Sequence, residues 1–270
     1  ARVLATEGTD GIRYAVDEDE AERCPQEKSL KVVLRNLGIA ESKLQGSLRK
    51  FPGVRWGSWL LGDSCAVLGI ELPGHPNLGG ALHPDIGKLT ALWDLDLGDT
   101  NVSGSLDVLA KNTELATLHL RHTRVGGQLE DLSKAKGLLD LDLTGTEVTG
   151  YLAALANATK LRYLSWSNTA VLGELKSLAK LTELEELKLA NLKVGGDVAV
   201  MAEWSKIEHV DLSGTEVEFD FLQFEPYSEL GDEWQCPFPS ALRFLDVSRT
   251  PQFSQAQDLL RPLAGCGNLA

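Results

Sequence analysis

The stretch LLDLDLTGTEVTGYLAAL, residues 138–155, combines leucines at two-residue spacing with a Thr, a Gly and two further spaced leucines. Variants of it recur along most of the chain with the pattern LxxLxLxxTxVxGxLxxL. Their first residues lie 23 positions apart, at Leu92, Leu115, Leu138, Leu161, Leu184 and Ile207. Looser copies begin at Val67 and Leu242. A repeat that stays in phase over this length predicts one supersecondary unit stacked on copies of itself.

Each copy contains a segment with alternating apolar residues and a segment in which the chain turns. The last two leucines of LxxLxL point inward from a short strand, while the residues between them point outward. A Gly, as in TGT, VSG and VTG, permits the turn that follows, and the later LxxL returns as a loose helical turn. The head LxxLxLxx at this period resembles the leucine-rich repeat. That resemblance implies a right-handed α/β solenoid with short parallel strands on its concave face.

One column of the repeat carries Thr where leucine-rich repeats usually carry Asn. Its members are Thr100, Thr123, Thr146, Thr169, Thr215 and Thr250. We expect these hydroxyls to point inward and to cap backbone groups of the turn. An outward Thr ladder that binds ice is the less favoured alternative, because Leu192 takes the position in one copy. Trp166 replaces a strand leucine and should be buried, whereas Trp93 should lie outside.

Residues 24–66 predict an N-terminal cap. Pro25 and Glu27 suit the start of a helix, and an apolar stripe along that helix would cover the open end of the first coil. The stripe consists of Leu30, Val33, Leu34 and Leu37. The segments CPQEKSLKVVLRNLG, WGSW and DSCAVLGIELPG resemble the N-terminal cap of plant-type extracellular leucine-rich repeat proteins, such as receptor-kinase ectodomains and polygalacturonase-inhibiting proteins. This chain has one cysteine, Cys65, where that cap usually has two or more. The Thr-for-Asn repeats also resemble long arrays in algal and protist proteins. The resemblance implies binding of proteins or peptides, usually through the inner face.

The remaining segments fall outside the regular spacing. Residues 1–23 are acidic and lack periodicity, which predicts a flexible arm. Residues 67–270 carry the eight repeats, but 35 residues separate Ile207 from Leu242, so an aromatic insertion lies near 218–238. Dense aromatic residues in a projecting loop are typical interface anchors, and the alternative is that they fold back against the edge of the solenoid. The predicted partner-binding residues of the insertion are Phe221, Phe224, Tyr227 and Trp234. The last residues match the start of a further copy, so we expect either a longer protein or a partner that covers this end.

The net charge of −13 disfavours nucleic acid and anionic membranes as partners and favours a basic protein or a cation. No apolar run approaches the roughly 18 residues that a membrane-spanning helix needs. Four cysteines lie as two terminal pairs and are the disulfide candidates: Cys24, Cys65, Cys236 and Cys266. Such pairs fit disulfide-closed caps and slightly favour a secreted or organelle-lumenal location over the cytoplasm, although four reduced thiols fit the sequence about as well.

The outward strand positions predict a compact patch of carboxylates with one imidazole, formed by Asp94, Asp96, His119, Asp140 and Asp142. Such a patch could hold a hard cation or perform acid–base chemistry. It lies on a shallow, solvated face, however, and the chain has neither a G-x-S-x-G motif nor a phosphate loop. We therefore predict no metal site, no cofactor and no enzyme activity.

The sequence favours non-catalytic recognition of another protein through the concave face and the aromatic insertion. The predicted concave contacts are Trp93, Asp96, His119, Arg121, Asp142, Tyr163 and Lys188. One alternative is a structural accessory subunit whose open end and insertion dock into a larger complex. Another is a cation- or glycan-binding module.

Overall fold

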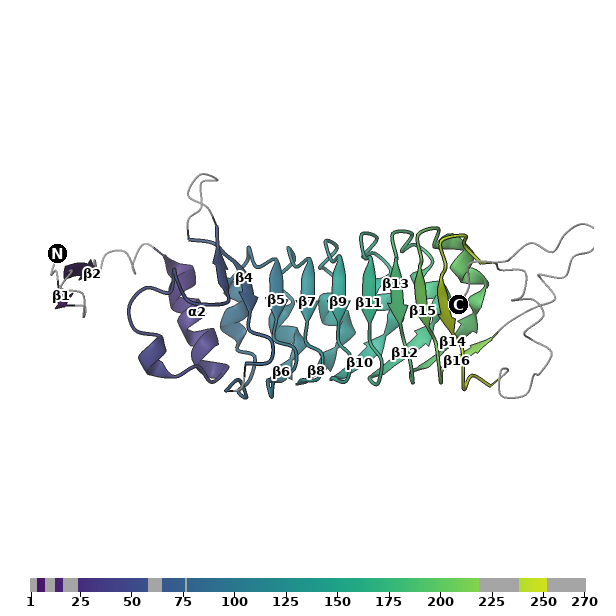
Figure 1. Ribbon diagram of the computed structural model, residues 1–270, viewed down its shortest axis with the longest axis horizontal. Helices are drawn as coiled ribbons and strands as arrows, with labels where there is room; N and C mark the ends of the chain where they lie inside the picture. Colours follow the sequence, from purple (N-terminus) through teal and green to yellow (C-terminus); the bar gives the residue numbers. More distant parts are fainter. Residues whose placement is uncertain are drawn as a thin grey trace, which may run out of the picture.

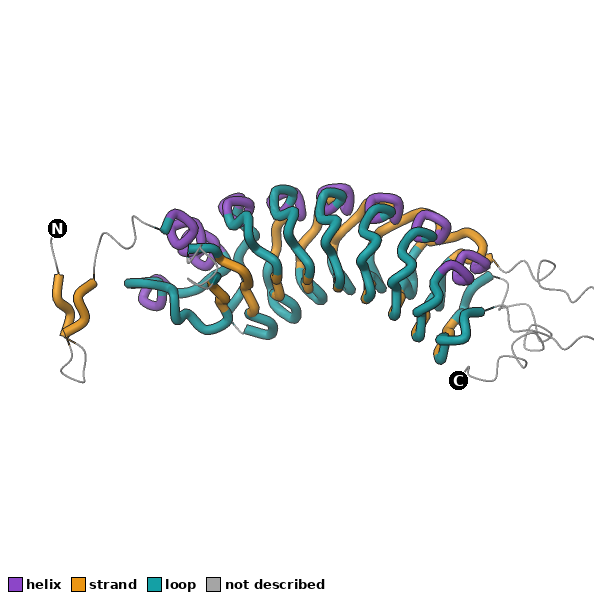
Figure 2. Tube along the Cα trace, turned by 90° about the horizontal axis from the view of Figure 1, so that it is seen from above, coloured by secondary structure: helices purple, strands orange, loops and turns teal. Residues whose placement is uncertain are grey.

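The computed structural model describes residues 4–7, 13–16, 24–57, 65–75, 77–218 and 238–251. Within the first two ranges, strands β1 (Leu4–Glu7) and β2 (Arg13–Val16) pair antiparallel. The repeats that follow stack side by side into a curved solenoid (Figures 1 and 2). This stacking confirms the predicted leucine-rich repeat solenoid. None of its described helices is long and apolar enough to cross a bilayer.

The concave face of the solenoid is a sheet with nine strands among the described residues (Figure 1). In spatial order they are β3 (Val54–Trp56), β4 (Val67–Glu71), β5 (Asp94–Asp96), β7 (Thr117–His119), β9 (Asp140–Asp142), β11 (Tyr163–Ser165), β13 (Glu186–Lys188), β15 (His209–Asp211) and β17 (Phe244–Asp246). The strands from β4 onward are parallel, and β3 pairs antiparallel with β4. Because successive strands pair in register, residues 23 apart lie next to each other across this face.

A second parallel sheet follows the turn after each concave strand, and the sequence analysis did not foresee it. Its strands are β6 (Ser103–Ser105), β8 (Arg124–Gln128), β10 (Glu147–Tyr151), β12 (Ala170–Glu174), β14 (Lys193–Asp197) and β16 (Glu216–Glu218). Each strand from β6 to β14 contains or directly follows the buried Val of a VxG segment, such as Val148, and β16 contains the buried Val217. The following Gly lies in the left-handed region, as at Gly150 with φ 117°.

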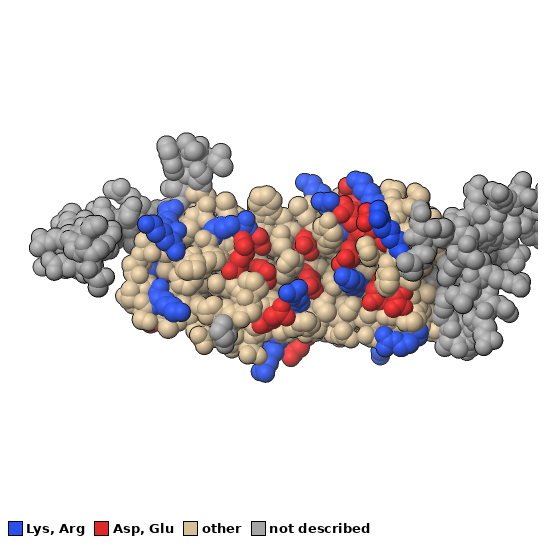
Figure 3. Space-filling view, viewed as in Figure 1, with Lys and Arg blue, Asp and Glu red and all other residues tan. Residues whose placement is uncertain are grey.

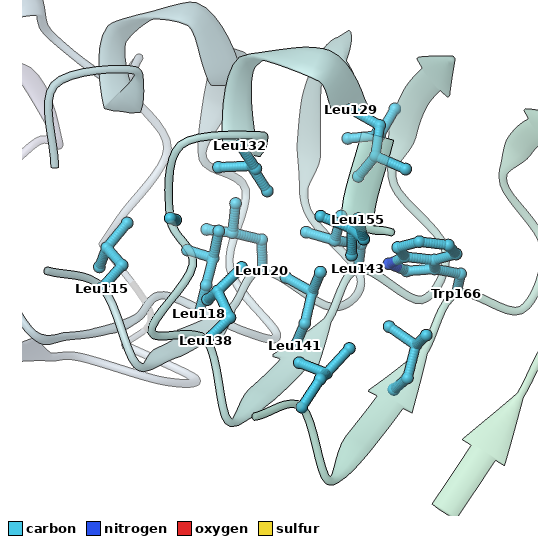
Figure 4. Close-up of a cluster of buried hydrophobic side chains, with 14 of the residues drawn as sticks. Leu115, Leu118, Leu120, Leu129, Leu132, Leu138, Leu141, Leu143, Leu155 and Trp166 are labelled. Atoms are coloured by element: carbon cyan, nitrogen blue, oxygen red, sulfur yellow. The ribbon is translucent and has the colours of Figure 1, made fainter. Parts of the chain in front are cut away.

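Short 3-10 helices form the convex layer, where the sequence predicted loose helical turns (Figure 2). They are η3 (Pro84–Lys88), η4 (Leu106–Leu109), η5 (Leu129–Leu132), η6 (Leu152–Leu155), η7 (Leu175–Leu178) and η8 (Val198–Glu203). The first and last leucines of η4 to η7 are buried in the coil with the strand leucines, and Ile86 of η3 and Val198 and Met201 of η8 are buried in the same core. Figure 4 shows this packing, with Leu129 and Leu132 facing Leu118 and Leu120.

Trp166 is fully buried at a strand-leucine position, as predicted, and lies beside Leu143 and Leu155 (Figure 4). Trp93 is 53% exposed, which confirms that it lies outside the coil. The two indoles therefore occupy the faces that the period-two alternation of the strand assigns to them.

The Thr column is buried, which confirms its inward orientation and leaves it no outward ladder for ice. Five of the six hydroxyls donate to the carbonyl oxygen three residues earlier, for example Thr146 to Leu143 at 2.7 Å and Thr215 to Leu212 at 2.5 Å. Thr169 is the exception: it is half-buried, and its hydroxyl has no hydrogen-bond partner among the described residues. The buried members are Thr100, Thr123, Thr146, Thr215 and Thr250. Leu192 is buried at the same position of its copy. These hydrogen bonds satisfy one backbone acceptor in each turn, which a buried polar group requires.

The N-terminal cap is built around α2 (Pro25–Asn36), with η1 (Glu41–Lys43) after it. The predicted apolar stripe of α2 is fully buried against the first coil. Glu27 on the same helix is also buried, and its Oε1 accepts the Leu48 backbone N–H at 2.6 Å. That carboxylate therefore joins α2 to the segment that leads into β3.

Candidate recognition surface

Two columns of outward side chains cover the concave face, with the register that the repeat spacing predicted. The first column contains Gly69, Asp94, Thr117, Asp140, Tyr163, Glu186, His209 and Phe244. The second contains Glu71, Asp96, His119, Asp142, Ser165, Lys188, Asp211 and Asp246. Strand residues are held by backbone hydrogen bonds on both sides, so these columns are rigid platforms for a ligand.

Five carboxylates gather over β4, β5 and β9, and we call them the acidic cluster: Glu71, Asp94, Asp96, Asp140 and Asp142. The cation His119 stands among them. Its Nε2 lies 3.0 Å from Asp140 Oδ1, and its Nδ1 lies 3.8 Å from Asp96 Oδ2. The hydrogen bond to Asp140, followed by the interaction with Asp96, raises the pKa of His119 to about 10. The imidazole is therefore a fixed positive charge at neutral pH.

Arg55 on β3 supplies the second cation of this region. Its Nε lies 2.5 Å from Glu71 Oε1, and its guanidinium also pairs with Asp94. Burial nevertheless raises the pKa of Asp94 above its ordinary value, because Arg55 offsets only part of the desolvation. Five carboxylates against two cations leave the surface from β4 to β9 with a net negative charge, and red side chains lie along this part of the concave face in Figure 3.

Some of these aspartates also hold the turn after their strand. Asp96 Oδ1 accepts the Gly98 backbone N–H at 3.0 Å, and Asp142 Oδ1 accepts that of Thr144 at 3.0 Å. Asp211 and Asp246 make the same contact with the residue two positions later. Partial burial would raise the pKa of Asp96, but His119 and this backbone N–H hold it below the ordinary value. One carboxylate oxygen of each aspartate therefore takes part in holding the turn.

The concave face changes in character beyond β9, where the first column carries the rings of Tyr163, His209 and Phe244 with one carboxylate, Glu186, among them. Tyr163 is 38% exposed, and its hydroxyl donates to Glu185 Oε2 at 2.8 Å. His209 and Phe244 stack with their ring centroids 6.3 Å apart. Lys188, in the second column, pairs with Glu186 on its own strand at 2.7 Å.

The structure brings some of the predicted contact residues together and separates others. Asp96, His119 and Asp142 share the region of the acidic cluster, and Tyr163 and Lys188 lie one and two strands along from it. Arg121 lies in the turn after β7, where its guanidinium pairs with Asp99 at 2.8 Å. Trp93 lies at the flank of the face rather than in either column. Phe221, Phe224, Tyr227 and Trp234 lie outside the described residues, whereas Phe238, which follows them, is buried against the core.

The sequence analysis missed Arg55, because β3 lies in the cap and has no counterpart in the repeats. It also left Phe244 unselected, although the repeat register already placed that residue in the first column. Within the described ranges, no group of three or more His, Cys, Asp or Glu side chains has the geometry to hold a metal ion.

Cys24 and Cys65 lie together at the cap as thiols. The Cys24 Sγ donates to the Cys65 carbonyl oxygen at 3.6 Å, and Arg49 lies 3.4 Å from the Cys65 Sγ. Burial, with a further contribution from the Cys65 thiol, raises the pKa of Cys24 to about 11. A bridge between these residues stays a prediction, and Cys236 and Cys266 lie outside the described residues.

A scan against protein-family models and a search among curated protein sequences return no match. Among solved structures, the chain is similar to the leucine-rich repeat ectodomain of the plant receptor kinase GASSHO1/SCHENGEN3 from Arabidopsis thaliana, in complex with CASPARIAN STRIP INTEGRITY FACTOR 2. The TM-score is 0.70 at 18% identity over 90% of this chain and 29% of that one. The PEPR1–AtPEP1 structure gives 0.62 at 20% identity over 90% and 37%. A plant ice-binding protein gives 0.59 at 19% identity over 83% and 79%.

The chain spans less than two fifths of the first two of these structures, which are longer solenoids of the same architecture. At this level of identity the similarity concerns the fold. The parallel concave strands, the convex turns and the helical cap agree with it. The chain therefore has the leucine-rich repeat fold, and this fold is similar to that of plant receptor ectodomains.

Proposed function

We propose that this chain is a non-catalytic recognition scaffold that binds a protein partner through its concave face. The partner presents an extended basic segment that lies along the strands from β4 to β9. The aromatic insertion near 218–238 supplies a second contact region, in keeping with its density of large aromatic side chains.

The observation that carries this proposal is the charge imbalance of the concave face. The acidic cluster has five carboxylates, and His119 and Arg55 form ion pairs with them. Arg121 lies nearby, but its guanidinium pairs with Asp99. A basic segment would supply the missing positive charge and be drawn to the surface by the net charge of −13. Rigid strands fix the carboxylates in place, so little conformational entropy is lost on binding.

The similar solved structures agree with a binding role, since the first was determined in complex with CASPARIAN STRIP INTEGRITY FACTOR 2. We do not propose ice binding, the property in the name of one similar structure, for this chain. Its buried Thr hydroxyls point inward and donate hydrogen bonds to the turn, as at Thr146. Acid–base catalysis is also disfavoured, because a His119 that keeps its proton up to high pH is a poor general base near neutrality.

The first test is selection of binders from a displayed library of random peptides. We expect the selected peptides to be enriched in Lys and Arg. Neutralising Asp94 and Asp140 together, as Asp94→Asn/Asp140→Asn, should weaken the best peptide about tenfold or more, because two charge pairs are lost. Asp107→Asn is the matched control, because Asp107 is exposed on the convex η4 and should not change the affinity.

Binding is measured by calorimetry at low and at physiological salt, and affinity should fall as salt rises. Selected peptides without basic residues, or an affinity that the concave double variant leaves unchanged, would contradict the proposal.

A further inference from the structure

A third column of side chains, the flank column, lies one residue before the first column of the concave face. Backbone hydrogen bonds join its members from repeat to repeat, for example from the Trp93 N–H to the Leu68 carbonyl oxygen at 2.9 Å and from Ala116 to Trp93 at 2.8 Å. In order the column contains Leu68, Trp93, Ala116, Leu139, Arg162, Glu185, Glu208 and Arg243. It is apolar over its first four positions and charged over its last four.

The charged half of the flank column is paired within itself. Arg162 contacts Glu185 at 2.5 Å, and Arg243 lies 3.7 Å from Glu208. In the row beside it, Lys206 pairs with Glu183 at 2.6 Å. These cross-repeat ion pairs need no external partner.

The apolar half differs, because Trp93 stands 53% exposed beside a hollow of about 420 Å³. The small residues Ala91, Ala116 and Gly137 leave this space open, and Leu68 and Leu139 add apolar surface to it. Glu114 and Lys160 complete the lining with one charge of each sign. An exposed indole beside a hollow with several apolar walls is the kind of surface that anchors a large apolar side chain in an interface. We call this space the flank hollow.

The flank hollow adjoins the acidic cluster directly. Trp93 precedes Asp94, and Leu139 precedes Asp140. The carboxylates of the first column therefore lie one residue along the strand from the flank column. The carboxylates of Asp96 and Asp142 stand three residues away from the flank column, which is about 10 Å at the rise of a strand. Apolar and anionic features are thus side by side on the same rigid elements.

We infer that the flank hollow holds a large apolar side chain of the basic segment, an inference that rests on the proposed function. An extended peptide advances about 3.3 Å per residue, so its cations would reach the carboxylates from positions one to three residues away from the anchor. The partner motif is therefore a Leu-sized or aromatic residue with Lys or Arg within three positions.

Two other occupants fit the charge less well. A neutral sugar could stack on Trp93, but it would leave the adjoining carboxylates without cations. A second copy of this chain carries a net charge of −13 and would add like charge to the same surface. A peptide with both apolar and basic side chains complements the flank hollow and the acidic cluster at once.

The test compares two synthetic peptides, one of alternating Lys and Leu and one of alternating Lys and Ser. They are titrated into the wild-type chain and into Trp93→Ala, Gly137→Leu and Arg243→Ala. Gly137→Leu fills the hollow without strain, because a Cβ there would lie 3.7 Å from its nearest neighbour, the Leu115 carbonyl oxygen. Arg243→Ala is the matched control, since it truncates an exposed member of the charged half of the same column.

Wild type and Arg243→Ala should bind the Lys–Leu peptide about tenfold or more tightly than the Lys–Ser peptide, as burial of one leucine predicts. Trp93→Ala and Gly137→Leu should bring the two affinities together, while the Lys–Ser affinity stays that of wild type. Unchanged circular dichroism would show that both variants are folded.

The outcomes separate the two proposals. Equal affinities for the two peptides in the wild-type chain would overturn the anchor and leave recognition of basic segments standing. Failure of both peptides to bind would overturn both. Binding of a β-glucan oligosaccharide that Trp93→Ala abolishes would assign the hollow to a sugar instead. Self-association in sedimentation that Trp93→Ala abolishes would assign it to a second copy.

Discussion

His119 shows how the setting of a single residue decides its chemistry. An imidazole near two aspartates could act as a proton shuttle, yet Asp140 and Asp96 hold its proton so firmly that its pKa rises to about 10. Near neutral pH the ring is therefore a fixed cation within the acidic cluster. It partly balances the carboxylates and holds the Asp140 side chain through the 3.0 Å contact with its Oδ1.

This arrangement makes the stability of the fold depend on pH above neutrality. The folded-state pKa of His119 is about 10 against an ordinary value of 6.5, so its ion pairs contribute fully below pH 6.5. That contribution should decline as the pH rises from 6.5 and be lost above about 10. Nuclear magnetic resonance of the imidazole should show a charged ring at pH 8.

The control is His119→Gln, which has no proton to lose in this window. Its denaturant midpoint should change less between pH 6.5 and 10 than that of the wild-type chain. A His119 resonance that titrates near its ordinary value would show that the two aspartates do not hold the proton.

At the scale of the element, the turn glycines decide how the two sheets join. Gly127 has φ 101°, and a Cβ there would lie 2.6 Å from Ser105 Oγ and 2.8 Å from the Leu106 backbone nitrogen. The equivalent glycines of the neighbouring repeats, Gly104, Gly150 and Gly173, share the left-handed conformation. This column allows β8 and its neighbours to approach the 3-10 layer of the preceding repeat.

Gly127→Ala should therefore lower the free energy of unfolding by about 2 kcal/mol or more, from left-handed strain together with the contact on backbone. Gly195→Ala is the matched control, because Gly195 stands one position earlier in its own repeat and its Cβ would make an ordinary 3.4 Å contact. Denaturant unfolding of both variants measures the difference. An equal loss of unfolding free energy in the two variants would show that the left-handed conformation is not the reason for glycine at position 127.

The sequence predicted the elements whose residue pattern is specific to one kind of secondary structure. It missed the elements whose residue pattern a loop can also have. Alternating leucines identify the concave strands, and their register placed Asp96, His119 and Tyr163 in the correct columns. The second sheet escaped prediction, because a single Val before a Gly marks each strand and a loop could show the same pattern. Arg55 escaped for another reason, since only pairing of β3 with β4 brings it to Glu71 and Asp94.

At the scale of the whole molecule, one continuous surface carries two kinds of side-chain environment. Its first half joins the acidic cluster to the flank hollow, and its second half presents the aromatic rings of Tyr163 and Phe244 among paired charges. Curvature turns all of these features toward the same space (Figure 2). The six-stranded sheet faces elsewhere and carries Tyr151, which is 57% exposed, as an internal reference.

Hydroxyl-radical footprinting with the tightest library-selected peptide tests the account most directly, because it compares these exposed aromatic residues in one sample. Binding should protect Trp93 and Tyr163 from oxidation and leave Tyr151 as reactive as in the free chain. Protection of Tyr151, with Trp93 and Tyr163 unchanged, would place the ligand away from the concave face and contradict the account.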